Sequence, residues 1–254
     1  MAVRTPTLSV KALWEKFLLS SHLRFVERAL YESGETGVTV DVGCGQGSFL
    51  HHLKERSVWP VAGLEFSLPA AADAWRVHEV PAVCGTLSRA PFAPGSCAVI
   101  TMFLVLQRLY SPADFLDAAH TLLAPEGRLI VQVPNASSWQ FLLFGSQWMG
   151  LDVPRQLIFF KATDVENLLK ECGFEILRRQ DFTLRDNPAM LVASLFPGLD
   201  PEIRKARQLA EARGLRFWKN LAYHALFVLA IPLAFLESAC HAGATVMIEA
   251  RKRQ

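Results

Sequence analysis

The stretch V-T-V-D-V-G-C-G-Q-G-S-F-L, residues 38–50, decides the fold of this chain of 254 residues. A short β-branched run ends in glycines and passes into an amphipathic stretch that reaches Arg56. This order predicts a strand, a tight turn and a helix. The turn holds glycines at alternate positions, namely Gly43, Gly45 and Gly47. Because glycine lacks a Cβ atom, such a turn allows positive φ angles and lets a ligand approach the backbone closely.

Strands and helices continue to alternate on both sides of this turn. Further strands are predicted at residues 61–66, 82–84, 98–104, 128–133, 175–182 and 245–250. Apolar residues spaced three to four apart predict helices at residues 8–31, 48–56, 69–77, 112–123 and 163–172. We therefore expect an α/β fold, a Rossmann-like, doubly wound, seven-stranded and mostly parallel sheet. An N-terminal helical arm (1–35) precedes the main domain (36–254), and a helical cap is inserted before the last strand.

The amino-acid composition indicates which partners and which cellular compartment to expect. The formal net charge is +2, and the basic residues are scattered, so we expect no nucleic acid partner. One basic run, from Arg204 to Lys219, is diluted by Glu202 and Glu211. The five cysteines show no paired spacing, and the N-terminus lacks the apolar stretch of a secretory signal, which together predict a cytoplasmic protein.

Two carboxylates near the glycine turn indicate which kind of ligand the turn could bind. Asp41 precedes the turn by two residues, where it would repel a pyrophosphate but attract a cation or an ammonium group. Glu65 ends the second predicted strand, where an acid can accept hydrogen bonds from both hydroxyls of a ribose. A nucleoside with a cationic tail satisfies both acids.

Residues 36–180 resemble the class I methyltransferases that use S-adenosyl-L-methionine. The likeness rests on D-V-G-C-G-Q-G (41–47), Glu65 after V-A-G-L, A-P-F-A-P-G-S (90–96), L-L-A-P-E-G-R-L-I-V (122–131) and V-P-N (133–135). The later segments F-G-S-Q-W and P-R-Q-L-I-F-F resemble the branch that holds ubiquinone-biosynthesis-like and natural-product methyltransferases. The resemblance implies SN2 methyl transfer to a small-molecule acceptor, aromatic or lipid-like.

The resemblance also implies a set of cofactor-binding residues: Asp41, Gly43, Cys44, Gly45, Gly47, Glu65, Phe66, Gly85, Thr86, Leu87, Met102 and Phe103. Three positions depart from the family pattern. Thr86 stands where the family usually has an aspartate for the adenine amine, Gln107 and Arg108 stand where many members have Glu-His, and Glu126 replaces a turn glycine.

The acceptor side is less defined. An insertion at 136–160 follows the strand-five end, where α/β sheets place ligands. Candidate acceptor residues are Gln107, Arg108, Trp139, Trp148 and Arg155, with core packing as the competing interpretation of the two tryptophans. The sequence indicates no general base and no metal site, and it favours surface or packing roles for His51, His52 and His120.

An apolar stretch, residues 217–236, lies within a predicted helical segment at 184–240. Its most apolar part, 221–236, is about sixteen residues, shorter than a membrane span of about twenty. Three interpretations stay open: a buried or homodimer-forming helix, a helix in peripheral contact with a membrane surface, and a lid over an apolar acceptor.

Two rival functions also stay open. A nicotinamide-dependent oxidoreductase would fit the glycine turn and Glu65, but Asp41 and the single-domain length disfavour it. A pseudoenzyme that keeps the fold and acts as a membrane-associated or partner-binding module would fit the departures at Thr86 and Gln107.

Overall fold

The computed structural model describes residues 10–56, 58–207 and 212–253. Its centre is a seven-stranded sheet of order β3-β2-β1-β4-β5-β7-β6. Only β7 runs antiparallel to its neighbours. The strands are β1 (Val38–Val42), β2 (Val61–Glu65), β3 (Ala82–Cys84), β4 (Cys97–Phe103), β5 (Leu123–Pro134), β6 (Phe174–Gln180) and β7 (Thr245–Lys252). The predicted fold is confirmed.

Helices cover both faces of the sheet because its central strands bury both sides. On one face, Ile100 of β4 packs in a cluster with Leu116 of α5 (Pro112–Leu122) and Val165 of α7 (Ala162–Glu171). On the other face, Val99 packs in a cluster with residues of α2 (Ser20–Ser33) and α3 (Ser48–Arg56). Successive strand residues point to opposite faces, so the apolar run of β4 feeds both cores. Helix α4 (Leu68–His78) packs beside β2 and β3.

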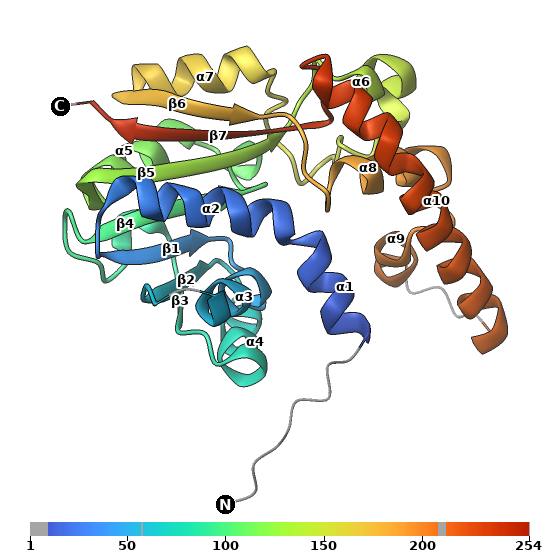
Figure 1. Cartoon of the computed structure of the whole chain (residues 1–254), viewed down its shortest axis with the longest axis horizontal. Helices are drawn as coiled ribbons and strands as arrows, with labels where there is room; N and C mark the ends of the chain where they lie inside the picture. The colour runs from blue at the N-terminus through green and yellow to red at the C-terminus, as the bar shows by residue number, and fades with distance from the viewer. Residues whose placement is uncertain (1–9, 57, 208–211, 254) are drawn as a thin grey trace, which may run out of the picture.

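The N-terminal region differs from the single helix predicted at 8–31. Two helices, α1 (Val10–Leu18) and α2, meet at Leu19, and residues 1–9 lie outside the described part. Leu23 and Val26 of α2 are completely buried in the same cluster as Val99 and Ile130. Helix α2 is therefore a layer of the domain, whereas α1 projects toward the end of the sheet where the parallel strands terminate (Figure 1).

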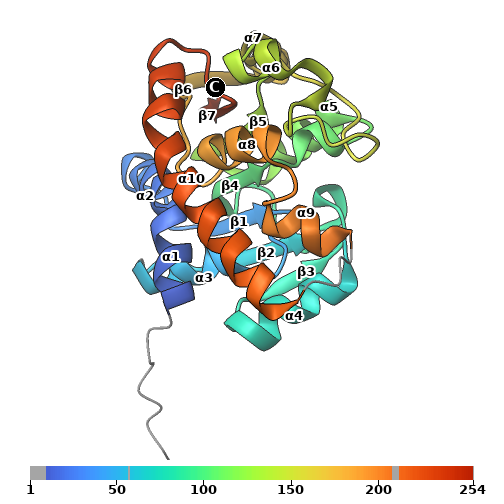
Figure 2. The ribbon, with the colours of Figure 1, turned by 90° about the vertical axis from the view of Figure 1, so that its right-hand side faces the viewer.

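The insertions before and after β6 gather at the carboxyl ends of the parallel strands (Figures 1 and 2). They hold α6 (Trp139–Phe144), the short turn η3 (Gly145–Gln147), α8 (Asn187–Leu195), α9 (Pro201–Ala206) and α10 (Arg213–Ala239). Two other short turns follow earlier strands, η1 (Leu87–Arg89) after β3 and η2 (Leu106–Arg108) after β4. Residues 208–211 of the predicted helical segment, Glu211 among them, lie outside the described part.

Helix α10 is longer than the sequence suggested. It runs for 27 residues, and Pro232 lies inside it. A proline leaves the carbonyl four residues earlier without its helical donor. Pro232 and Val228 are both exposed, so water can satisfy that carbonyl and the helix continues. Within the described residues, α10 is the one helix that could span a membrane by length and composition.

Candidate functional site

The glycine turn leaves β1 in the left-handed region that glycine favours. Gly43, Gly45 and Gly47 have φ values of 76°, 54° and 81°. The amide of Gly43 donates to the Leu64 carbonyl at 2.7 Å, which ties the turn to the end of β2. A Cβ atom on Gly43 would lie 2.6 Å from Cγ2 of Val105, whereas one on Gly45 would meet nothing within 4 Å. Steric contact therefore constrains Gly43, and backbone conformation constrains Gly45.

Glu65 ends β2 directly against this turn. Its Oε2 accepts a hydrogen bond from the Gly45 amide at 2.8 Å. Its Oε1 accepts from the amides of Phe66 at 2.8 Å and Ser67 at 3.0 Å. The carboxylate is thereby held at the mouth of the turn, with acceptor oxygens available to a pair of vicinal hydroxyls.

Asp41 is the last but one residue of β1, on the inner side of the turn, and is only 4% exposed. Thr101 on β4 donates its hydroxyl to Oδ1 at 2.6 Å. Burial raises the pKa of Asp41 to about 7 despite this hydrogen bond. Near neutral pH, Asp41 is therefore ionised in about half of the molecules. A cation placed beside Asp41 would favour the ionised form.

Two neighbouring hollows meet over the turn and share Gly43 and Phe103. The first, of about 400 Å³, also holds Glu65, Phe66 and Arg108. The second, of about 320 Å³, holds Asp41 and Arg185. It is also lined by Glu15 and Leu18 from α1, by Leu19 between α1 and α2, and by Ser48 and Phe49 from α3. Their sizes are those of small-molecule sites. We call the two hollows together the cleft.

The structure brings seven of the predicted site residues to the cleft: Asp41, Gly43, Cys44, Glu65, Phe66, Phe103 and Arg108. Leu87 and Met102 are buried in the core instead. Gly47 packs against α4, since a Cβ there would lie 3.1 Å from Cβ of Ala74. Gly85 and Thr86 follow β3, and Gly85 donates its amide to the Glu65 carbonyl at 3.0 Å.

Two acceptor predictions are contradicted by burial. Trp148 is 2% exposed, and its Nε1 donates to Oε1 of Gln140 at 3.4 Å. Its ring also covers Gly150, where a Cβ atom would lie 2.3 Å from it. Trp148 is therefore a core residue of the insertion. Gln107 is equally buried, and its carbonyl accepts from the amides of Leu157 and Ile158, which anchors the insertion.

The other acceptor candidates lie near the surface. Arg108 forms an ion pair with Asp152 at 3.2 Å, and Arg155 pairs with the same carboxylate at 3.3 Å. Of these, only Arg108 lines one of the two hollows. Trp139 is half-exposed at the start of α6.

Arg185 is a cleft residue that the sequence analysis missed. It precedes α8, and its side chain is 33% exposed. Its Nε lies 2.8 Å from Oδ1 of Asp186. Burial works against the charge of Arg185, but Asp186 and Asp41 outweigh it and raise its pKa. Arg185 thus brings a fixed positive charge to the hollow that contains Asp41.

A buried polar network supports Arg185 from behind. His22 on α2 is fully buried, with Nε2 2.8 Å from Oε1 of Gln132 and 3.4 Å from Oδ2 of Asp186. Burial lowers the pKa of His22, so the imidazole is neutral at pH 7. Its ring also meets Phe103 edge to face at 4.9 Å. Gln132, a polar residue inside an apolar strand, was the one sequence signal that could have indicated this network.

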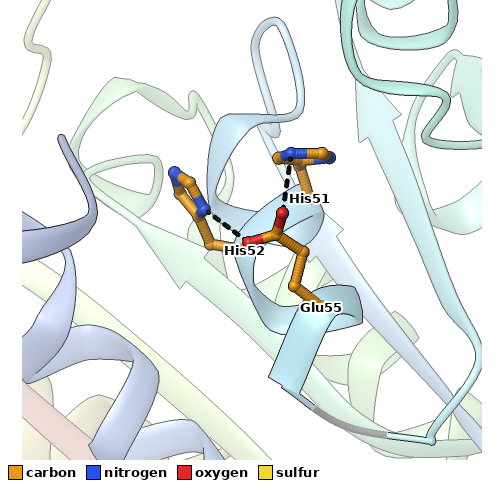
Figure 3. Close-up of side chains that lie close together, drawn as sticks. All are labelled: His51, His52 and Glu55. Carbon is orange, nitrogen blue, oxygen red and sulfur yellow. Dashed lines mark hydrogen bonds and ion pairs between the residues drawn. The ribbon is translucent and has the colours of Figure 1, made fainter. Parts of the chain in front are cut away.

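A separate cluster on α3 has metal-like geometry. The rings of His51 and His52 flank the Glu55 carboxylate, at 3.6 Å and 3.4 Å (Figure 3). The three ligand atoms lie within 4.8 Å of one another. None of these residues lines either hollow, and the two ion pairs already account for the arrangement.

Comparisons with known proteins agree with this geometry. A family model described as a methyltransferase domain matches residues 14–179. A search of curated proteins finds no match. Among solved structures, the chain is similar to a putative sarcosine dimethylglycine methyltransferase from Galdieria sulphuraria, with a TM-score of 0.61 and 13% identity over 91% of this chain and 85% of that one.

Two further structures show how widely the fold is used. Geranyl diphosphate C-methyltransferase from Streptomyces coelicolor A3(2) matches with a TM-score of 0.56 and 15% identity, covering 99% of this chain and 88% of that one. The [4+2]-cyclase SpnF matches with the same TM-score and 19% identity, covering 91% and 81%. At these identities the likeness establishes the fold alone.

The match to the family model covers more than half of the chain, so the chain belongs to this methyltransferase family. It is an enzyme of the class I fold, and its cofactor is S-adenosylmethionine. These predictions from the sequence are confirmed.

Proposed function

We propose that the enzyme methylates a small acceptor that is aromatic or lipid-like. When bound, S-adenosylmethionine would supply an electrophilic methyl group on a sulfonium. An acceptor oxygen, nitrogen or carbon would bond to that methyl carbon in an SN2 reaction as the S–CH3 bond breaks and the neutral thioether leaves. The observation that supports this proposal best is the pairing of unlike charges, Asp41 and Arg185, in the hollow that adjoins Glu65 across Gly43.

The charges of the cleft match the two ends of the cofactor. Asp41 would face the ammonium group of the methionine part, directly or through water, and Arg185 would face the carboxylate. Glu65 would accept the ribose hydroxyls, and Phe66 lies beside it. Gly85 and Thr86 are proposed to flank the adenine, with Thr86 replacing the usual aspartate, whereas the Leu87 side chain packs in the core.

Apolar side chains favour an apolar acceptor. Phe103, Val105 and Leu109 line the first hollow, and Arg108 and Asp152 stand at its rim. Leu104, between Phe103 and Val105, has a φ of 57°. This value is strained for a residue other than glycine, and such strain is common at functional sites. This wall would exclude water and orient an aromatic or prenyl-like group.

The chain's catalytic contribution is alignment. His22 is neutral but fully buried, and its Nε2 already faces Gln132 and Asp186, so it does not reach an acceptor as a base. Holding the acceptor at near-attack distance is sufficient to accelerate transfer from an activated donor.

Location and assembly belong to the same proposal. A cytoplasmic site is supported by the five cysteines, all of which are free thiols. The proposal includes peripheral membrane contact through residues 217–236, with a homodimer through the same helix as its alternative.

Transfer of a radiolabelled methyl group from S-adenosylmethionine to a panel of phenols, quinols and prenyl compounds tests the function. Turnover on an apolar acceptor, lost in Glu65→Ala, would support the proposal. Binding of the cofactor without turnover on any member of the panel would favour a non-catalytic module instead. Oxidation of NADH by the folded protein would favour the oxidoreductase.

A further inference from the structure

Helix α10 carries an outer face that is apolar along most of its length. Large side chains recur on it at helical spacing, each between 50% and 70% exposed: Trp218, Leu221, Leu229, Leu233, Phe235 and Leu236. Between Lys219 and Glu237 the helix has no Asp, Glu, Lys or Arg. Contiguous apolar patches above a few hundred Å² are rare on soluble monomers and mark interaction sites.

The opposite face of α10 belongs to the protein. Phe227, Ala230 and Ala234 are buried, and the helix packs along α8. Glu237 is also buried, where its carboxylate accepts from the amide and the side chain of Gln140 at 3.0 and 2.9 Å. The polar residues near the carboxyl end of the helix, Glu237 and Ser238, are thus buried against the protein, and the outer face between Lys219 and Glu237 is left apolar.

This arrangement excludes a membrane span. A spanning helix would be surrounded by lipid, whereas α10 is covered by α8 on one side and is tied to the sheet by β7, which begins six residues after Ala239. In both views α10 lies obliquely across the end of the molecule, with its outer side uncovered by any described element (Figures 1 and 2). A helix in this position can lie in the plane of a surface.

Positive charge marks one end of the outer face. Four basic residues are exposed here, Lys205 in α9, Arg207 just after it, and Arg213 and Arg216 at the amino-terminal end of α10, against one exposed acid, Glu202 in α9. Trp218 follows within the first two turns. Basic residues attract anionic lipid headgroups, and tryptophan favours the boundary between headgroups and acyl chains. The charge complements an anionic bilayer.

Through its protein-facing side, α10 is separated from the cleft by one helix, α1. Trp14 of α1 packs on Phe227 and His224 of α10, with ring centroids 5.7 and 5.5 Å apart. The next residues of α1, Glu15 and Leu18, line the hollow that contains Asp41. A molecule dissolved in lipid at α10 would therefore approach the cleft along α1.

We propose that α10 docks the enzyme on an anionic lipid bilayer, outer face down, and that the acceptor is taken from that bilayer. The docking stands on the helix alone. The origin of the acceptor rests on the proposed function.

The test is co-sedimentation of the full chain with vesicles of phosphatidylcholine alone or mixed with phosphatidylglycerol. The wild type should bind the mixed vesicles more tightly, and raising the salt from about 0.1 M to about 1 M should weaken binding. Leu233→Asp should weaken binding at least tenfold. Val77→Asp on α4 is the matched control, since both side chains are 61% exposed, and it should bind as the wild type does.

Two results would overturn docking. The first is wild-type protein that stays in the supernatant with both vesicle compositions. The second is a dimer in light scattering that Leu233→Asp dissociates, because a second copy would then cover the face. Titration of each sample with S-adenosylmethionine separates the proposals. Cofactor binding without vesicle binding defeats docking alone, and vesicle binding without cofactor binding defeats the proposed function alone.

Discussion

Replacing Asp41 with asparagine should stabilise the protein while weakening cofactor binding. Burial raises the pKa of Asp41 from its ordinary 3.8 to about 7. Below pH 3.8 both the folded and unfolded chains hold the proton, so burial of the acid costs nothing. Between 3.8 and 7 the unfolded chain releases the proton first, and stability falls as the pH rises. Asparagine does not ionise and lacks this cost, and its Oδ1 can still accept from Thr101.

The size of the effect follows from the shift. Each pKa unit corresponds to about 1.4 kcal/mol, so the pKa shift of Asp41 costs roughly 4 kcal/mol of stability at about pH 8 and roughly 2 kcal/mol at about pH 5. Urea unfolding of the wild type and of Asp41→Asn, followed by tryptophan fluorescence, measures the gain in stability at each of the two pH values. Asp114→Asn is the control, because Asp114 is exposed on α5 and its replacement should change little. An Asp41→Asn gain that is absent, or equal at both pH values, would refute the reasoning.

The same group sets the pH dependence of binding. A cationic ligand favours ionised Asp41, so the affinity of the wild type for S-adenosylmethionine should rise with pH up to about 7, by at most about tenfold per unit. The α-amino group of the ligand titrates near about 7.7 to 8.0, outside this window. Calorimetric titrations of Asp41→Asn should show weaker binding that does not vary with pH below about 7.

Further substitutions distinguish residues that bind the cofactor from residues that only stabilise the fold. Gly45→Ala and Gly34→Ala both place a Cβ atom in open space at positive φ, so each should lose about 1–2 kcal/mol of stability by urea unfolding, but only Gly45→Ala should weaken the cofactor in calorimetry. Equal affinities in the two variants would contradict the assigned turn. Arg185→Gln should weaken S-adenosylmethionine at least tenfold, and it should also lower stability in urea because buried Asp186 loses its cationic partner; an unchanged Kd in the folded variant would remove Arg185 from the site. Trp148→Ala should cost about 3–5 kcal/mol and leave the Kd unchanged, whereas a large loss of affinity would restore Trp148 to the cleft.

The sheet could be predicted from the sequence because its signals are local. Each strand is a short apolar run. The glycines that directly follow the first run indicate a tight turn, because glycine allows positive φ angles. Asp41 and Glu65 follow from the turn because the carboxyl ends of adjacent parallel strands meet at one edge. Both acids lie in the cleft as expected from this argument.

The rest of the cleft could not be predicted because it is assembled from distant segments. Arg185 and His22 lie far apart in the chain, and they come together only when α2 and the loop before α8 close over β5. Trp148 was a candidate acceptor residue because it follows the end of a strand, but an aromatic side chain at such a position can equally well pack in the core, as Trp148 does. Helix α10 extends beyond the predicted apolar stretch, residues 217–236, at both ends, because Arg213, Arg216 and Glu237 do not continue an apolar pattern.

Calorimetric titration of the folded protein with S-adenosylmethionine, and separately with NADH, tests the central claim most directly. We expect micromolar binding of the methyl donor, at least tenfold weaker in Asp41→Ala and in Glu65→Ala, and no binding of NADH. A folded wild type that does not bind the donor, or that binds it with the same affinity in both variants, would contradict the assigned cofactor site.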